Sequence, residues 1–227
     1  MLGTIVNAAA IAAGGLIGLL LKKGLNERIG DTVMKGVALV VLYIGISGAL
    51  KGQNVLIATL SIVIGGIIGS AIDLDARFTN FAHKLEKLFV KNGAENSTFG
   101  EAFVTTTLLF CVGAMAVVGS LNSGLTGDHE VLFAKSLLDG VSSVMFGAAL
   151  GPGVILSAVP VLLYQGAITL LAQVIQPFLS DAAVAEMTCV GSLLIIAIGL
   201  NMMGVTKIKV MNYIIGVFLP MALCLVM

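Results

Sequence analysis

An acidic residue lies in the middle of a long apolar stretch of this chain, "FAKSLLDGVSSVMFGAALGPG" at residues 133–153. Residues three, four, seven and eight apart share one face of a helix. The face that carries this acid therefore also carries a lysine one turn before it and two serines one turn after it, namely Lys135, Asp139, Ser142 and Ser143. A carboxylate beside hydroxyl groups suits a proton or a hard cation such as Na⁺. The alternative is a structural Lys135–Asp139 ion pair, and the sequence leaves both interpretations open.

Other polar side chains inside apolar segments are further candidates for binding a solute or an ion. They are Asn7, Ser47, Tyr164, Gln165 and Asn201, with threonines at 105–107. Each is more simply explained by a hydrogen bond between helices. Gln165 gains weight because "YQGA" places an amide next to a glycine, where a helix can loosen.

Titratable residues also cluster just before the segment that carries Asp139. Asp128, His129 and Glu130 follow one another there, and Lys135 comes five residues later. Together they could gate a pathway or sense pH on the outer side. The alternative is a solvated helix start, where acidic residues are favoured.

The composition indicates the environment that positions these residues. The chain has 227 residues, of which 58% are hydrophobic and 11% charged, and its mean hydropathy is +1.10. Soluble domains carry about 25% charged residues. The apolar residues come in runs of bilayer length, without the alternation of barrel strands. We therefore expect an all-α, polytopic transmembrane helical bundle, and the zero net charge gives no reason to expect a nucleic-acid partner.

Eight apolar segments are expected. They are Leu2–Leu21, Thr32–Leu50, Val55–Ile72, Phe103–Leu121, Lys135–Leu150, Gly153–Ile175, Thr188–Met203 and Val210–Val226. The fifth has only 16 residues, so it is either tilted or paired with the fourth as a hairpin that dips into the membrane. The lysines follow the first segment, which makes it a membrane span and not a cleaved leader. The three cysteines, Cys111, Cys189 and Cys224, lie in apolar runs and read as small core residues.

The positive charges predict the orientation. With the N-terminus outside, ten lysines and arginines fall in inner loops and two, Lys51 and Lys135, fall outside. Inner loops are rich in such residues, so we expect both termini on the extracytoplasmic side. Residues 73–98 are expected to be cytoplasmic, with an amphipathic helix on the membrane surface followed by a linker.

The layout also predicts an internal repeat in a single transmembrane domain. Residues 1–72 and 152–227 each contain three segments, and residues 99–151 form a central helix pair between them. Aligning "YIGIS" with "AIGLN" makes Gly45 equivalent to Gly199 and Ser47 equivalent to Asn201. Because the sixth segment crosses in the opposite sense to the first, the repeats would be inverted, an arrangement common in secondary transporters.

Three stretches resemble a known family. "MLGTIVNAAAIAAGGLIGLLLKKG", "FCVGAMAVVGSLNSGLTGDHEVLFAKSLLDG" and "PVLLYQGAITLLA" are similar to the YqgA/YdfK-like family of bacterial multi-pass membrane proteins. The resemblance covers almost the whole chain. It implies a protein of the bacterial cytoplasmic (inner) membrane, but it brings no substrate and no site because the family is of unknown function.

These features predict a small secondary transporter of an ion or small polar solute, coupled to Na⁺ or H⁺ through Asp139. The alternatives are an ion channel and a structural or assembly protein without a substrate. We expect no enzymatic activity and no cofactor beyond a bound Na⁺ or proton. The expected partners are the lipid bilayer, the solute or ion, and a second copy of the chain in a homodimer.

Overall fold

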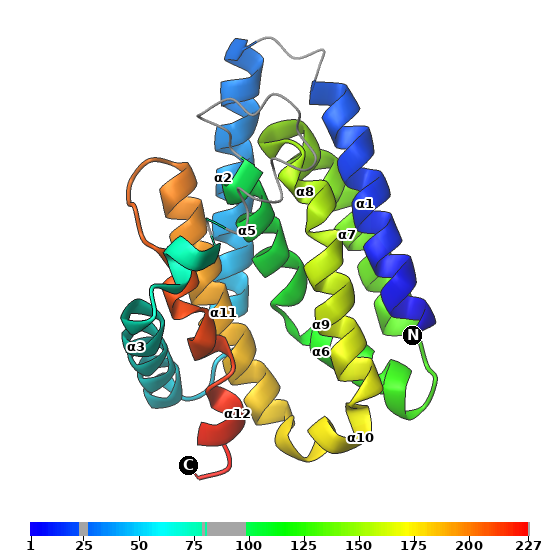
Figure 1. Cartoon of the computed structure of the whole chain (residues 1–227), viewed down its shortest axis with the longest axis vertical. Coiled ribbons are helices and arrows are strands. Elements are labelled where there is room, and N and C mark those ends of the chain that lie inside the picture. Colours follow the sequence, from blue (N-terminus) through cyan, green and yellow to red (C-terminus); the bar gives the residue numbers. More distant parts are fainter. Residues whose placement is uncertain (23–26, 79, 81–98, 227) are drawn as a thin grey trace.

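The computed structural model describes residues 1–22, 27–78, 80 and 99–226, and this part of the chain folds into helices (Figure 1). The long helices are α1 (Leu2–Lys22), α2 (Glu27–Ala49), α3 (Val55–Ala71), α7 (Glu130–Leu150) and α11 (Asp181–Met202). The intermediate ones are α5 (Phe99–Cys111), α6 (Ala114–Leu125), α9 (Ala158–Leu170) and the 3₁₀ helix η2 (Val210–Val217). Short helices of one turn complete the fold: α8 (Gly153–Leu156), α10 (Ala172–Ile175), the 3₁₀ helix η1 (Gln176–Phe178) and α12 (Pro220–Leu223).

Local sequence signals set several helix ends. Asn54 caps α3, because its side chain accepts hydrogen bonds from the N–H groups of Leu56 and Ile57. Ser180 caps α11 in the same way by accepting from the Ala183 N–H. Gly151, with φ of 98°, ends α7 in a conformation that only glycine adopts easily.

The helices pack in pairs that are far apart in the sequence. α1 lies along α7, α2 lies along α11, and α3 lies against η2 (Figure 1). α9 packs on both α1 and α6. A buried core that includes Ile11, Phe110, Phe146 and Val190 joins these pairs.

The lengths of the helices fit a membrane protein. Within the described residues, five helices are long and apolar enough to cross a membrane, and the α5–α6 pair, bent by 60°, makes a sixth if it is one span. Two shorter apolar helices, Val55–Ala71 and Val210–Leu223, coincide with the third and eighth predicted segments. The count of eight spans remains a prediction.

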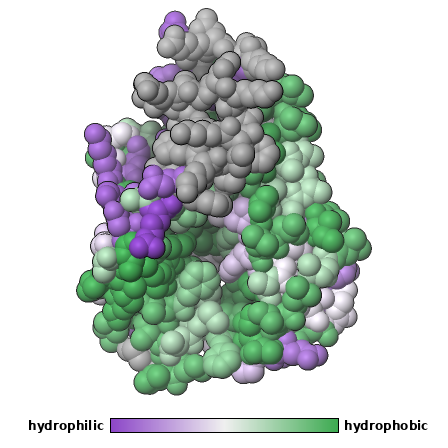
Figure 2. Space-filling model, in the orientation of Figure 1, coloured by the Kyte–Doolittle hydropathy of each residue, from purple (hydrophilic) through white to green (hydrophobic). Residues whose placement is uncertain are grey.

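The surface is also that of a membrane protein. Apolar side chains cover most of the visible face, and hydrophilic ones gather at the upper left and the lower right (Figure 2). Leu39, Leu137, Leu163 and Leu170 each expose more than half of their area. A soluble monomer rarely shows so much contiguous apolar surface, whereas a bilayer would cover it.

Several predicted boundaries need correction. The fifth segment is not short, because α7 begins at Glu130 and has 21 residues, so its length gives no reason for a hairpin. α11 begins at Asp181, seven residues before the predicted start. The fourth segment is broken at Val112 and Gly113. The predicted amphipathic helix lies almost wholly outside the described residues.

Candidate functional site

The acid in the fifth segment forms a buried ion pair within α7. Lys135 Nζ lies 3.0 Å from Oδ1 and 2.9 Å from Oδ2 of Asp139, one helical turn away. Each side chain exposes only 9% of its area. Burying either charge alone would be costly, whereas the pair has no net charge. The ion pair, one of the two interpretations that the sequence left open, is therefore present in this structure.

Two amide side chains from other helices complete the cluster. Asn7 of α1 donates from Nδ2 to Asp139 Oδ2 over 3.0 Å. The same Nδ2 group donates to Gln165 Oε1 of α9 over 3.3 Å. Asn7 and Gln165 are both fully buried. The structure thus brings together four of the predicted residues from three helices, and we call Asn7, Lys135, Asp139 and Gln165 the Asp139 cluster.

The Asp139 cluster has unused hydrogen-bonding groups. Asn7 Oδ1 and Gln165 Nε2 are buried and have no hydrogen-bond partner in the described residues. Leaving such groups unpaired costs about 1–3 kcal/mol each. A rearrangement or a bound species that satisfies them would recover that free energy.

Close contact between α1 and α7 brings Asn7 to Asp139. A Cβ on Gly14 would overlap the Gly140 carbonyl oxygen, and a Cβ on Gly18 would overlap the Val144 carbonyl oxygen. A Cβ on Gly147 would lie 2.6 Å from the Gly15 carbonyl oxygen. Small residues allow helix backbones to approach in membranes, and "AAGGLIG" at residues 12–18 supplies them on α1.

A helix break adjoins the cluster. α5 ends at Cys111, α6 begins at Ala114, and Gly113 between them has φ of 130°. α5 packs against α7, the helix that carries Lys135 and Asp139. A break leaves the last carbonyls of one helix and the first N–H groups of the next without partners in a helix. Such helix ends carry partial charges.

The serines after Asp139 do not bind it. Ser143 is fully buried and its Oγ has no partner, while Ser142 is only partly buried. Ser143 faces α1, since a Cβ on Gly14 would lie 3.0 Å from Ser143 Cβ. The expected carboxylate–hydroxyl site is therefore not formed here, because Asp139 takes Asn7 and Lys135 as partners instead.

The symmetric candidates, Ser47 and Asn201, are not part of the Asp139 cluster. Ser47 is exposed on the outer surface of α2. Asn201 holds the loop after α11: its Oδ1 accepts from Thr206 Oγ1 at 2.6 Å and from the Ile208 N–H at 2.9 Å. Its Nδ2 donates to the Ile208 carbonyl at 2.8 Å. These bonds give Asn201 a structural role in this conformation.

The residues before α7 form a helix start. Asp128 Oδ1 accepts the Glu130 N–H at 2.9 Å, and both residues are exposed. His129 is partly buried, with its ring edge-on to Phe133 at 5.9 Å between ring centroids. Glu130 lies in the first turn of α7, so this geometry matches the alternative of a solvated helix start with acidic residues.

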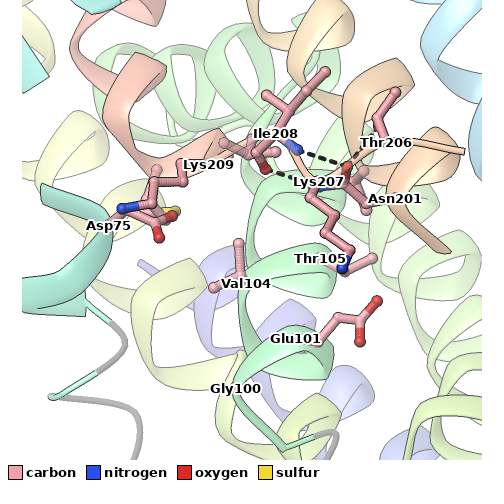
Figure 3. Close-up of a pocket in the computed structure, with 13 residues that line it drawn as sticks. Asp75, Gly100, Glu101, Val104, Thr105, Asn201, Thr206, Lys207, Ile208 and Lys209 are labelled. Carbon is pink, nitrogen blue, oxygen red and sulfur yellow. Dashed lines mark hydrogen bonds between the residues drawn. The ribbon is translucent and has the colours of Figure 1, made fainter. Parts of the chain in front are cut away.

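Two cavities involve other candidates. Tyr164 lines an apolar cavity of about 230 Å³ with Val117 and Met187. A larger one, of about 500 Å³, lies between α5 and the loop after α11 (Figure 3). Its charged residues are Asp75, Glu101, Lys207 and Lys209. Figure 3 shows Lys207 extending toward Glu101 and Thr105.

A second buried acid, Glu186 of α11, was not among the predicted site residues. It is only 2% exposed, and its Oε1 accepts the N–H groups of Gln53 at 2.6 Å and Asn54 at 2.8 Å. The predicted seventh segment began at Thr188, which left this residue in a loop. The Ser180 cap was the signal that could have placed it inside a helix.

Comparison with known proteins identifies the family. A family described as "Protein of unknown function (DUF554)" matches residues 2–225. The chain belongs to this family. It is 30% identical over 224 residues to the "Uncharacterized membrane protein YdfK" of Bacillus subtilis (strain 168), which covers 97% of this chain and 94% of that protein. It is 31% identical over 225 residues to the "Uncharacterized protein YqgA" of Escherichia coli (strain K12), which covers 98% and 96% respectively. No solved structure matches the chain.

The resemblance drawn from the three sequence stretches is thus confirmed. The description of YdfK supports a membrane protein, and the described residues form an all-helical fold. They assign no substrate and no functional residue to this family.

Proposed function

We propose that this protein is a secondary transporter that exchanges a small cation, Na⁺ in the first instance, for a proton at the Asp139 cluster. The observation that carries the proposal is a buried Lys135–Asp139 pair beside two amide side chains. Asn7 Oδ1 and Gln165 Nε2 of these amides have no hydrogen-bond partner in the described residues. An ion pair that served only to stabilise the fold would contribute most if every neighbouring polar group were hydrogen-bonded. We also propose that the protein has no enzymatic role.

The exchange conserves charge. A Na⁺ that binds Asp139 displaces the Lys135 ammonium, and the Asn7 and Gln165 carbonyl oxygens supply neutral ligands. The displaced ammonium would then be a buried charge without a partner, which favours its neutral form. Lys135 therefore releases one proton to water for each Na⁺ bound, and the reverse step re-forms the pair.

The break between α5 and α6 supports such a site. Interrupted helices line the ion sites of many transporters, and their carbonyl ends stabilise cations. α5 also connects the break to the 500 Å³ cavity, since Thr105 lines the cavity and Cys111 ends the helix. Six residues of helix span about 9 Å. This cavity is the proposed entry from the cytoplasm.

Helix contacts support the proposed inverted repeat. A Cβ on Gly45 would meet Ile196, and a Cβ on Gly199 would meet Leu42. Leu42 and Ile196 each lie three residues before the glycine of their own helix. A two-fold axis between α2 and α11 would exchange these two contacts, as the alignment of Gly45 with Gly199 requires. If residues 1–72 superposed on residues 152–227 by a rotation about an axis along the membrane normal, the inverted repeat would be contradicted.

The proposed setting is the bacterial inner membrane, with both termini outside. The end of α1 and the loop after α11 lie at one end of the molecule, opposite α10 (Figure 1). A cysteine at Thr126 in a cysteine-free background should react with an impermeant maleimide on intact cells, whereas one at Val205 should not. The reverse labelling pattern would invert the orientation.

Transport can be tested in proteoliposomes that contain a pH-sensitive dye. An imposed Na⁺ gradient should move protons in the opposite direction with the wild-type protein. Asp139→Asn keeps the shape of the side chain but removes its charge, so it should abolish the exchange while the protein stays folded. Ser47→Ala, an exposed change of similar size, serves as the matched control and should transport normally.

The alternatives predict other results. A channel would pass Na⁺ without moving protons, and Asp139→Asn would alter its selectivity. A structural or assembly role is favoured by the complete pairing of Lys135 with Asp139. In that case a double variant, Lys135→Met with Asp139→Leu, would keep every activity of the wild type, and this result would refute the proposed exchange.

A further inference from the structure

Glu186 has one oxygen that the protein leaves unused. Its Oε1 accepts both backbone N–H groups at the turn before α3, whereas Oε2 is buried without a hydrogen-bond partner. The described residues form no ion pair to this carboxylate. Its negative charge is therefore offset only by backbone dipoles, which leaves room for a cation from outside the chain.

A groove begins at this carboxylate. Glu186 lines a cavity of about 410 Å³ between α3 and α11, with Gly52 and Asn54 at the same end. The walls are apolar along α3 from Val55 to Val63, a length of about 12 Å for eight residues of helix. The cavity opens onto the outer surface, since Val55 is 82% exposed and Val63 is 52% exposed.

The oxygens of two other polar side chains in the groove are already hydrogen-bonded. The Asn54 side-chain oxygen accepts from the first N–H groups of α3. The Thr59 hydroxyl donates to the Val55 carbonyl at 2.7 Å. Among the described residues that line the groove, Glu186 Oε2 is a buried charged atom without a hydrogen-bond partner, and a single cationic donor would satisfy it.

We propose that this groove binds an amphiphile with a primary ammonium head and an apolar chain. The ammonium donates to Glu186 Oε2, and the chain lies along α3 toward the middle of the membrane. Charge complementarity selects the head, because an anion would be repelled and a neutral alcohol would leave the charge uncompensated. The apolar walls exclude a fully hydrated inorganic ion. The site lies on α3 and α11 and is independent of the exchange proposed at Asp139.

Such a head occurs in two sources, an aminophospholipid of the bilayer and a free alkylamine. Purified protein in detergent should be titrated with octylammonium, with octanol and octyltrimethylammonium as controls, while its melting temperature is followed. Octylammonium should raise the melting temperature saturably, because a ligand of the folded state stabilises it. The controls lack either the charge or the N–H donors and should have little effect.

A second experiment, with lipids, distinguishes a bilayer phospholipid from a free alkylamine as the occupant of the groove. Nanodiscs of phosphatidylethanolamine should stabilise the protein more than nanodiscs of phosphatidylcholine if the occupant is a lipid. Stabilisation by octylammonium alone would assign the groove to a free amine. No stabilisation by either would overturn the proposal.

Three variants make the test specific. Glu186→Gln keeps an oxygen for both backbone N–H groups but removes the charge, so it should weaken octylammonium binding at least tenfold. Glu130→Gln removes an exposed acid elsewhere and should bind as the wild type does. Thr59→Phe fills the groove from its exposed rim with Glu186 intact, and it should also lose binding.

Thr59→Phe decides the question if Glu186→Gln fails to fold. Unchanged octylammonium affinity in Thr59→Phe would place the amine elsewhere and refute the site. Unchanged affinity in a folded Glu186→Gln variant would do the same.

Discussion

Two buried carboxylates in this molecule are stabilised in different ways. Asp139 has a lysine one turn away on its own helix and an amide donor from α1. Within the described residues, Glu186 has two backbone N–H groups at the turn before α3 as partners, and its side chain lines a largely apolar groove. The first acid is enclosed by three helices, whereas the second lies at the edge of the bundle.

The difference shows how a chain can use buried acids without unfolding. A carboxylate with a counter-ion from the same chain forms a pair without net charge, and only a competing cation can separate the two groups. Backbone donors leave most of the charge in place, so the carboxylate remains an attachment point for a ligand. We therefore expect substitutions at the two sites to lower the free energy of unfolding by different amounts. We also expect different second substitutions to restore the lost stability.

The largest expected effect comes from separating the ion pair. Asp139→Leu leaves Lys135 as a buried charge without a partner and should destabilise the fold by about 3–5 kcal/mol. The double variant with Lys135→Met should recover most of that loss, because an apolar pair of similar size is often as stable as the ion pair. Thermal melting in detergent measures both.

A double variant no more stable than Asp139→Leu would show that the two charges are not coupled. Lys135→Met alone is the reciprocal control, since it leaves Asp139 without its cation.

A smaller loss is expected at the second acid. Glu186→Ala removes the acceptor of two backbone N–H groups. Each bond to a charged acceptor is worth about 1.5–3 kcal/mol, but Gln53 and Asn54 are exposed and water can replace part of the loss, so the cost should be about 2–3 kcal/mol. Glu186→Gln keeps an acceptor and should cost about 1 kcal/mol. Denaturation of both variants in the same detergent tests this order, and equal losses would show that the charge and not the backbone bonding dominates.

The amide that joins α1 to Asp139 should matter less than the lysine. Asn7→Ala removes one bond to Asp139 and one to Gln165, and it should cost about 1–2 kcal/mol. Gln165→Ala is the matched change on α9. If Asn7→Ala costs as much as Asp139→Leu, the amide and not Lys135 stabilises the carboxylate.

The smallest expected effect is at the unpaired hydroxyl. Ser143→Ala removes a buried group that has no hydrogen-bond partner, so stability should change by less than about 0.5 kcal/mol or rise slightly. Ser136→Ala is the control, because the Ser136 hydroxyl donates to the Leu132 carbonyl at 2.6 Å. A large loss for Ser143→Ala would mean that its hydroxyl is bonded in the native state.

The sequence predicted those features that depend on local spacing. Lys135 and Asp139 are four residues apart, so any helix through them places them together. Most apolar segments also appear within a few residues of their predicted bounds, because hydropathy is set residue by residue.

Features that depend on the rotation and partner of a helix were beyond the sequence. Nothing in the order of residues states that Asn7 faces Asp139 while Ser47 faces outward, since both lie in apolar helices. Glu186 was missed because acids at 181 and 186 lowered the local hydropathy and moved the predicted boundary past it. The break at Gly113 was equally hidden, since many glycines in these helices cause no break.

The pairing of α1 with α7 has a consequence for the biosynthesis of the protein. α1 is made first, but its main partner begins at Glu130, more than a hundred residues later. Until then the Asn7 amide lies in the bilayer without the carboxylate that it will bind, and the glycine face of α1 has no helix against it. Polar groups in membrane helices find temporary partners under these conditions. Assembly must therefore exchange such contacts for those with α7 and α9, so the N-terminal helix can reach its final position only after α9 is inserted.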